Sequence, residues 1–158
     1  MSAPAGHQRS PIVLEPMAPT HLADVLTLGR ELYDTSVKPY TSWSLSAIAG
    51  HMDAEAPACW VALDGDRIAG FVLGSMGFDQ RTDWGNLEWI ASAPDYQGQG
   101  VASHLVQACC ATLTAAGATA VVTDVESRNT ASAALMRRNG FTEGVTVTLF
   151  VREVEAVL

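Results

Sequence analysis

The sequence predicts an α+β fold, in which a single sheet carries helices on its faces. Its 158 residues, 48% of them apolar, are enough to enclose a hydrophobic core. Runs with strand-like and with helical periodicity follow one another in the order β-α-α-β-β-β-α-β-α-β-β. There is no internal repeat and no linker long enough to divide the chain. We therefore expect one domain over residues 11–158, after a flexible N-terminus at residues 1–10.

The N-terminal part of the chain predicts a short strand and two helices. Residues 12–15 form the expected strand. Thr20 is a suitable N-cap for a helix over residues 21–33, in which Leu22 and later leucines supply the apolar positions. After an aromatic loop, residues 45–52 predict a second, shorter helix.

The middle of the chain predicts three strands. Residues 58–63 and 68–77 flank the turn signal Asp-Gly-Asp at 64–66, which is typical of a hairpin. The polar run at 79–85 is expected to be a loop. It leads into a third strand at residues 86–92.

The last third of the chain predicts two helices among further strands. The first helix follows a glycine-rich turn and has apolar residues four apart at Val101, Leu105, Cys109 and Leu113, which indicates one buried face. Gly117 should end this helix. The rest predicts, in order, a strand at 120–125, a helix at 130–138 and one or two strands within 141–151.

Charge and cysteine content narrow the functional class. A net charge of −8 argues against nucleic acid or an anionic membrane as the main partner, and favours cationic acceptors such as amines. Cys59, Cys109 and Cys110 fit neither a disulfide framework nor zinc-ligand spacing, and the four histidines have no metal-binding spacing. Residues 1–10 lack the apolar core of a signal peptide. We expect a cytoplasmic protein without a metal.

The glycine-rich turn at residues 96–103 carries the strongest functional signal. It joins a strand to a helix, so its unpaired main-chain N–H groups and the positive end of the helix converge on one point. Gly98 and Gly100 let a ligand approach the backbone closely. The turn predicts an anion site, most plausibly for phosphate, although such a turn is also compatible with a simple tight connection. No lysine or arginine lies between Gln97 and Thr123, so main-chain dipoles must hold the anion.

A second motif follows about 30 residues later, Asn129-Thr-Ala-Ser-Ala-Ala-Leu-Met-Arg-Arg-Asn-Gly-Phe141. Together with Gln97-x-x-Gly100-x-Ala102, it resembles the GNAT superfamily of acetyl-CoA-dependent N-acetyltransferases. The two motifs and the strand before them span residues 86–141, and the order of the preceding elements extends the resemblance over nearly the whole chain. The resemblance implies a mixed, mostly antiparallel six- or seven-stranded sheet, split near its middle, with about four helices on its faces.

The resemblance also implies a site for acetyl-CoA. The strand before the turn would pair its main chain with the pantetheine arm and polarise the thioester carbonyl, roles that fall to Ile90, Ala91 and Ser92. One aimed N–H donor is typically worth about 3 kcal/mol in such a transition state. Asn129 would bond the pantetheine or reach the reacting atoms, unless it only caps its helix. The other cofactor-binding residues would be Gln97, Gly98, Gln99, Gly100, Val101, Ala102, Ser103, Ser132 and Met136.

One position departs from the family pattern. Seven residues after the asparagine the family often has a tyrosine that protonates the leaving thiolate, whereas this chain has Met136. A thioether donates no proton, so either another group serves or the thiolate leaves unaided, as a thiol pKa near 8.5 permits. Met136 is also compatible with simple core packing. Tyr33 and Tyr40 are substitutes only if the early loop folds over the site.

Glu88 is the candidate general base. An acceptor ammonium must lose a proton before it attacks, and a carboxylate within an otherwise apolar strand needs a partner or a purpose. Strand alternation predicts Glu88 on one face with Asn86 and Ile90, and Trp89 on the other. The family often carries a base on this strand that acts through water. A structural ion pair is the alternative for Glu88.

The sequence thus predicts an N-acetyltransferase that transfers the acetyl group of acetyl-CoA to a primary amine of a small molecule or protein, by direct attack in a ternary complex. The alternatives are a catalytically silent acyl-CoA-binding or sensor module and a nucleotide-binding protein that uses the same turn. The identity of the acceptor does not follow from the sequence, and a homodimer through the C-terminal strands stays open.

Overall fold

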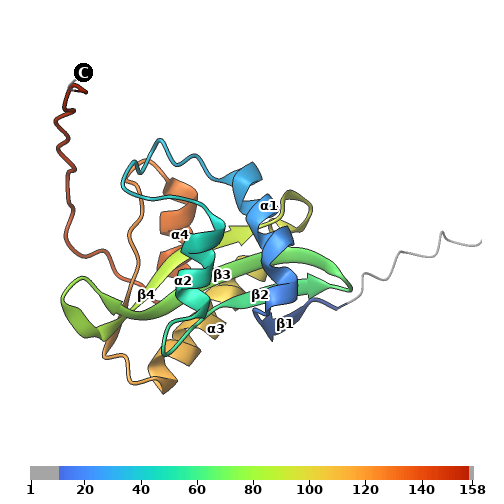
Figure 1. The fold of residues 1–158 in the computed structure, drawn as a ribbon. Coiled ribbons are helices and arrows are strands. Elements are labelled where there is room, and N and C mark those ends of the chain that lie inside the picture. Colours follow the sequence, from blue (N-terminus) through green and yellow to red (C-terminus); the bar gives the residue numbers. More distant parts are fainter. Residues whose placement is uncertain (1–10, 157–158) are drawn as a thin grey trace, which may run out of the picture.

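The computed structural model describes residues 11–156. The N-terminus predicted for residues 1–10 lies outside the described residues. Five strands and four α-helices are found in the described part, together with two short 3-10 turns, η1 and η2 (Figure 1). In chain order they are β1 Val13–Pro16, η1 Pro19–His21, α1 Leu22–Leu32, α2 Leu45–Met52, β2 Trp60–Asp64, β3 Arg67–Phe78, β4 Arg81–Ser92, η2 Pro94–Tyr96, α3 Val101–Ala115, β5 Ala120–Val122 and α4 Thr130–Arg138.

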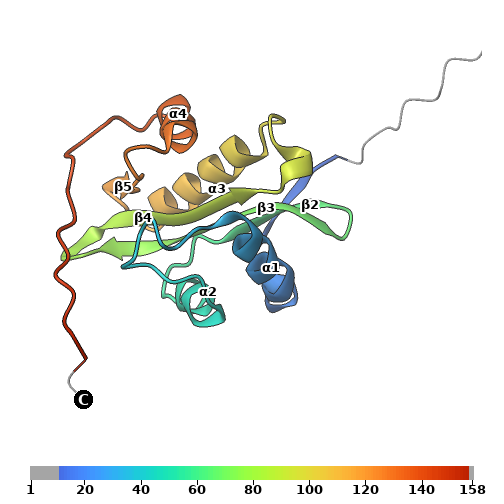
Figure 2. The same cartoon turned by 90° about the horizontal axis from the view of Figure 1, so that it is seen from above.

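The sheet has the strand order β1-β2-β3-β4-β5. The first four strands are antiparallel neighbours, and β5 runs parallel to β4. Helices α1 and α2 cover one face, whereas α3 and α4 lie on the other (Figure 2). The α+β class, the mixed and mostly antiparallel sheet and the number of helices are therefore confirmed. The predicted six or seven strands are wrong for the described residues, which form five.

The sheet splits beside β4. Strand β5 pairs only with the stretch from Trp84 to Asn86, since β5 is three residues long. Over residues 87–92, β4 has β3 on one side and no paired strand on the other within residues 11–156. The split lies between the fourth and fifth strands, next to the edge and not near the middle of the sheet, because the chain after α4 adds no strand.

The C-terminal segment 141–156 departs from the prediction of one or two strands. It forms no strand and leaves the body of the protein, as Figures 1 and 2 show. Its alternating apolar side chains are exposed, with Val145 at 93% and Val147 at 81%. Alternation makes a segment suitable for a strand, but a strand forms only when the segment pairs with the edge of a sheet, and this segment pairs with none.

Two local predictions are also wrong. Strand β4 begins at Arg81, within the segment 79–85 that was expected to be a loop. The chain reverses at Asp79, which has φ of 50°, and the polar side chains that follow bond one another, with Asp83 accepting from Arg81 at 2.9 Å. Thr20 lies inside η1 and does not cap α1, because α1 begins at Leu22 and its N-cap position is occupied by His21.

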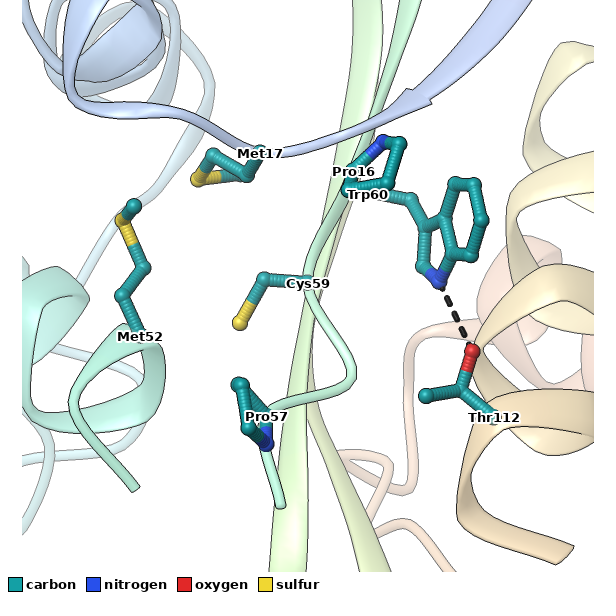
Figure 3. Close-up of a pocket in the computed structure, with 7 residues that line it drawn as sticks. All are labelled: Pro16, Met17, Met52, Pro57, Cys59, Trp60 and Thr112. Atoms are coloured by element: carbon teal, nitrogen blue, oxygen red, sulfur yellow. Dashed lines mark hydrogen bonds between the residues drawn. The ribbon is translucent and has the colours of Figure 1, made fainter. Parts of the chain in front are cut away.

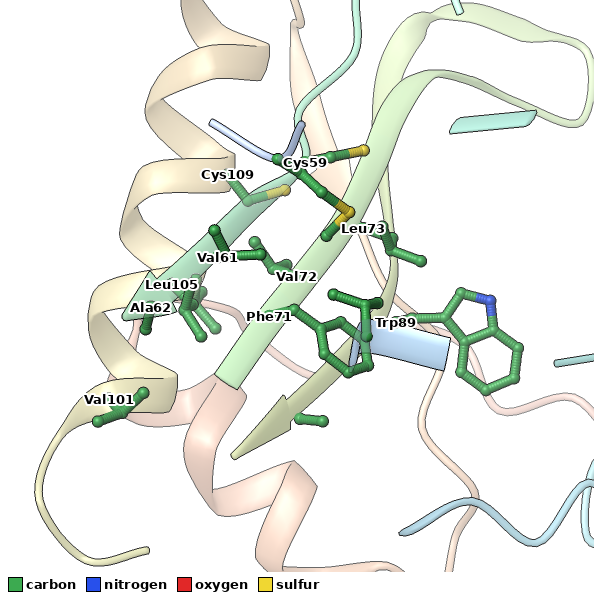
Figure 4. Packing of buried hydrophobic residues seen from close by; sticks show 14 of the residues in the cluster. Cys59, Val61, Ala62, Phe71, Val72, Leu73, Trp89, Val101, Leu105 and Cys109 are labelled. Carbon is green, nitrogen blue, oxygen red and sulfur yellow. The ribbon is translucent and has the colours of Figure 1, made fainter. Parts of the chain in front are cut away.

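Helix α3 is held tightly on the sheet. The predicted face of Val101, Leu105, Cys109 and Leu113 is buried, with exposures of 3% or less (Figure 4). Glycines in the sheet make the close approach possible, since a Cβ on Gly85 would lie 2.8 Å from Leu113 Cδ1. This packing fixes the N-terminus of α3 just beyond the end of β4, where the glycine-rich turn joins them.

Candidate acyl-donor and acceptor site

The glycine-rich turn leaves open space above its main chain. Gly98 and Gly100 have φ of 77° and 81°, a region that favours glycine. A Cβ on Gly98 would meet nothing within 4 Å, and one on Gly100 would meet only His104 Cε1 at 4.0 Å. The conformation of the turn, not crowding around it, explains why these positions are glycines.

The same turn presents a row of free donors. Within residues 11–156, the main-chain N–H groups from Gly98 to Ser103 have no hydrogen-bond acceptor, and the first helical bond runs from His104 N–H to Gly100 O at 3.1 Å. Tyr96 anchors the turn to the end of β2. Its side chain is 5% exposed, and its hydroxyl donates to Asp64 Oδ2 at 2.5 Å. Rigid donors at a helix N-terminus are suited to a phosphate or diphosphate.

The main chain of β4 faces the split at alternate residues. Ala93 N–H donates to Ala69 O at 2.8 Å, and Ser92 and Ile90 pair with Gly70 and Val72 of β3. Because hydrogen-bonded and non-hydrogen-bonded pairs alternate in an antiparallel ladder, the N–H and C=O groups of Ile90 and Ser92 point away from β3.

Those of Ala91 point towards β3, where Ala91 O would lie 2.6 Å from a Cβ on Gly70. The structure therefore brings the main chain of Ile90 and Ser92, but not that of Ala91, to the split.

Tyr33 reaches the split from the end of α1. Its hydroxyl donates to Ile90 O at 2.8 Å, and its ring contacts Trp89 and Trp43 with centroid distances of 4.7 and 5.0 Å. Burial raises the pKa of Tyr33, so its phenol keeps its proton and its hydrogen bond to the Ile90 carbonyl. Tyr33 therefore does not act as the acid that would replace the family's tyrosine at position 136.

Tyr40 donates to Asp124 Oδ2 at 2.8 Å, and this bond is the main reason that its pKa is raised. Neither tyrosine is therefore poised to protonate a thiolate.

Glu88 occupies a β-bulge. Trp89 pairs with Leu73 and Leu87 pairs with Gly74, so Glu88 is the extra residue between them. Its side chain turns towards α2, while Trp89 contacts Tyr33 at the end of α1. Glu88 and Trp89 thus share the face covered by α1 and α2, and the predicted alternation is wrong at this point.

The Glu88 carboxylate has an unexpected partner on α2. Glu88 Oε2 is hydrogen-bonded to His51 Nε2, and His51 Nδ1 lies 2.9 Å from Ser75 Oγ on β3. The Glu88 side chain is 37% exposed, whereas that of His51 is 11% exposed. Sequence reasoning missed His51 and Ser75, because no spacing in the sequence links α2, β3 and β4.

Helix α4 lies beside α3 and brings the second motif to the turn. Asn129 is the N-cap of α4, since its side-chain oxygen accepts from Ser132 N–H at 3.1 Å. Met136 is 5% exposed and packs in the core. Asn139, predicted only to end the helix, donates to Ser103 Oγ at 3.1 Å and so ties α4 to the start of α3.

The loop between α1 and α2 spans the split. Lys38 Nζ donates to the main-chain oxygen of Asp124 at 2.8 Å and to Asp124 Oδ2 at 3.1 Å. Asp124 lies just after β5, whereas Tyr33 at the start of the loop is bonded to β4. The loop therefore contacts both sides of the split and covers it on the α1–α2 face.

A separate apolar cavity lies at the start of β2, away from the split. It has a volume of about 260 Å³ (Figure 3). Burial raises the pKa of its one thiol, Cys59, and the Thr112 hydroxyl is already used by Trp60 Nε1 at 2.9 Å. The cavity has no group suited to chemistry. Its lining residues are Pro16, Met17, Met52, Pro57, Cys59, Trp60 and Thr112.

Neither a metal site nor a membrane span is found in the described part of the chain. Residues 11–156 contain no group of three or more His, Cys, Asp or Glu side chains arranged to hold a metal ion. In the same range no helix is long and apolar enough to cross a bilayer.

Comparison with known proteins identifies the family of the chain. A family model described as the acetyltransferase (GNAT) family matches residues 24–141. Over 83 residues the chain is 34% identical to N-alpha-acetyltransferase 30 of Schizosaccharomyces pombe. That match covers 52% of this chain and 55% of the yeast protein, so the chain spans about half the length of the curated relative it matches.

Solved structures show the same fold. Aminoglycoside N-acetyltransferase AAC(6')-Iy in complex with CoA has a TM-score of 0.77 and 23% identity, over 92% of this chain and 97% of that chain. The ribosomal-protein-S18-alanine N-acetyltransferase from Escherichia coli has a TM-score of 0.69 and 22% identity, over 85% of this chain and 79% of that chain. At such low identity these likenesses establish the fold alone.

Proposed function

Because this chain belongs to the acetyltransferase (GNAT) family, we propose that it transfers the acetyl group of acetyl-CoA to a primary amine. The sequence-based assignment to this family and to its acyltransferase class is confirmed by the family match. In the proposed reaction the amine nitrogen attacks the thioester carbon within a ternary complex. A C–N bond forms, the C–S bond breaks, and CoA leaves as a thiolate.

The observation that carries this proposal is the row of unpartnered N–H groups from Gly98 to Ser103 beside the split. We propose that they hold the diphosphate of acetyl-CoA, with the Gln97 and Gln99 side chains flanking it. Main-chain groups of Ile90 and Ser92 would pair with the pantetheine arm, and the N–H of Ser92 would polarise the thioester carbonyl. Asn129, Ser132 and Met136, at the start of α4 and along it, would border the pantetheine arm. Val101 and Ala102 would border it at the start of α3, and Ala91 would lie beneath it on β4.

The acceptor is proposed to enter from the α1–α2 face, where Glu88 acts as the base, directly or through a water. A base matters most for lysine-type or alkyl amines, since at neutral pH only about one in a thousand such amines is unprotonated. Relatives whose names specify aminoglycosides, N-alpha-acetylation or a ribosomal-protein alanine support small-molecule and protein amines equally. Polyamines, amino acids and lysine side chains complete the set to be screened.

Removing the charge of Glu88 tests the acceptor side. Glu88→Gln is expected to lower kcat/KM for an alkylamine about a hundredfold, because general base catalysis contributes on that order. Acetyl-CoA affinity, measured by calorimetry, should stay within about twofold because Glu88 does not border the turn. Glu15→Gln is the matched control, because Glu15 is also a strand glutamate and is exposed on β1. An unchanged rate across the pH range would remove Glu88 from the mechanism.

The same assay separates an enzyme from a silent acyl-CoA-binding module. Steady CoA release with at least one amine of the set supports the enzyme. Tight acetyl-CoA binding without turnover of any amine would favour the binding or sensor module, and protection from thermal unfolding by ATP but not by acetyl-CoA would favour a nucleotide-binding protein.

We further propose that residues 11–158 act as one acetyltransferase domain in the cytoplasm. The three cysteines, all free thiols, support a reducing compartment. A second copy of the chain is the proposed partner, through the segment 141–156. Strand β5 ends the sheet with a free edge, and a hollow of about 300 Å³ opens next to it, lined partly by Val121 and Phe141. An added strand from a second copy would cover both the edge and the exposed apolar face of the segment.

The dimer is tested by placing a charge on that face. The wild-type chain is expected to sediment as a dimer at micromolar concentration, and Val147→Lys as a monomer, because the lysine would be buried against β5. Thr146→Lys lies on the opposite face of the segment and should leave the dimer intact. A monomeric wild-type chain would contradict the proposal.

A further inference from the structure

We propose that His51, supported by Ser75, is a positioning residue that holds one oxygen of Glu88 and leaves the other free for the acceptor ammonium. The inference rests on the proposed function, in which Glu88 is the base. It adds two residues from α2 and β3 to the acceptor side of the site. Neither residue lies in the two sequence motifs, and neither borders the glycine-rich turn.

The contact between Glu88 Oε2 and His51 Nε2 requires a proton between them. A bare imidazole nitrogen and a carboxylate oxygen are both acceptors and would repel each other at hydrogen-bond distance. With Glu88 ionised, as a general base must be, His51 carries the hydrogen on Nε2 and donates it to Glu88. In the neutral ring Nδ1 is then an acceptor, and the Ser75 hydroxyl, 2.9 Å away, donates to it. The carboxylate, which can only accept, thus selects the tautomer, and the Ser75 hydroxyl, which can donate or accept, completes it by donating to Nδ1.

Glu88 needs such a partner because it lies at the bulge. There it has no neighbour directly opposite on β3 to restrain it, and its side chain is 37% exposed. A mobile carboxylate is a poor base, because proton transfer depends on hydrogen-bond geometry. His51 is buried in the last turn of α2, whose start is capped by Ser44, with its hydroxyl accepting from Ala47 N–H at 3.2 Å.

Like His51, Ser75 is held in place by its surroundings. It pairs with Asn86 of β4, and an isolated bridge joins it to Pro57. The hydrogen-bonded series Ser75–His51–Glu88 therefore runs from two side chains held by β3 and α2 to the partly exposed carboxylate of Glu88. Its effect is directional: Glu88 Oε2 is occupied by His51, and Oε1 is left to accept a proton from the ammonium or from a bridging water. The N–H bond of the ammonium breaks, and the proton passes to Glu88.

Three variants test the positioning role. His51→Phe is expected to lower kcat for an alkylamine roughly tenfold, with acetyl-CoA affinity unchanged, because only the orientation of the base is lost. His51→Gln keeps an N–H donor and should recover most of that loss. Ser75→Ala should keep the fold and the Nε2–H tautomer, which ¹⁵N NMR of the ring nitrogens detects, but it leaves Nδ1 without its donor and should lower kcat less than His51→Phe does. His21→Gln, remote from the split, is the control for histidine replacement.

A double-mutant cycle decides the outcome. If His51 acts through Glu88, adding His51→Phe to Glu88→Gln should cost no further activity. Independent, multiplicative losses would overturn the proposal, as would equal losses in His51→Phe and His51→Gln that follow the melting temperature. Failure of the proposed function looks different: no amine is acetylated by the wild-type chain, while NMR still reports the Nε2–H tautomer of His51.

Discussion

Gly100→Val is expected to weaken the binding of acetyl-CoA by about a hundredfold or more, whereas Gly65→Val leaves it intact. Both glycines have positive φ, 81° and 59°, and a Cβ at either site meets nothing closer than 4.0 Å. The strain of a side chain in this conformation, of about 1–2 kcal/mol, should therefore be similar in both variants. Only at Gly100 does the side chain also enter the space over the N–H groups of residues 98–103.

Calorimetry with acetyl-CoA and thermal unfolding measure the two effects separately. Both variants should lose stability to a similar degree, while a loss of affinity of about a hundredfold or more is confined to Gly100→Val. Equal affinities in the two variants would show that the diphosphate is bound elsewhere. In that case the proposed acyl-donor site would be wrong, even though the family assignment stands.

Gly29→Ala is expected to disrupt the cover of the split. A Cβ on Gly29 of α1 would lie 2.1 Å from Trp43 Cε2, so the indole cannot stay on the helix. Trp43 stacks on Phe71 at 5.3 Å and donates Nε1–H to Leu26 O at 2.9 Å. Displacing it costs about 1–3 kcal/mol of overpacking, which should lower the melting temperature by about 5 °C. The loop between α1 and α2, which carries Tyr40, should then detach from the split. Tryptophan fluorescence should change, and amine turnover should fall.

Gly50→Ala is the matched control for Gly29→Ala. Gly50 lies in α2, and a Cβ there meets nothing within 4 Å. Alanine favours a helix over glycine by about 1 kcal/mol, so Gly50→Ala should raise the melting temperature slightly. If both variants were stabilised, Trp43 would not be locked onto α1 as the structure indicates. Acetyl-CoA affinity should be little altered in either, since neither glycine borders the glycine-rich turn.

Local signals in the sequence predicted the helices and the strand–turn–helix geometry of the glycine-rich turn well. The bounds of α2 and α4 agree with the prediction, because capping residues and stop signals lie within a few positions of the helix they limit. The turn could be found because its donors, glycines and helix start are contiguous in the chain. These features can be recognised without knowing which elements pack against them.

Features that depend on neighbouring elements could not be predicted in this way. The bulge at Glu88 is a property of the register between β3 and β4, not of either strand alone. The partner of Glu88 comes from 37 residues earlier, and Tyr33 bonds a carbonyl 57 residues later. The alternation after residue 144 predicted a strand that the described residues do not form, because alternation alone does not reveal whether a segment pairs with an edge.

The reliance on main-chain donors at the turn has a consequence for how the protein can change over time. In the proposed site, peptide groups would hold the coenzyme, which is common to every turnover, and most substitutions leave these groups in place so long as the glycines persist. The acceptor, which distinguishes one reaction from another, would meet side chains of the loop after α1 and of the bulge. Preference for a new amine can therefore drift by replacing those side chains, without rebuilding the hold on the coenzyme.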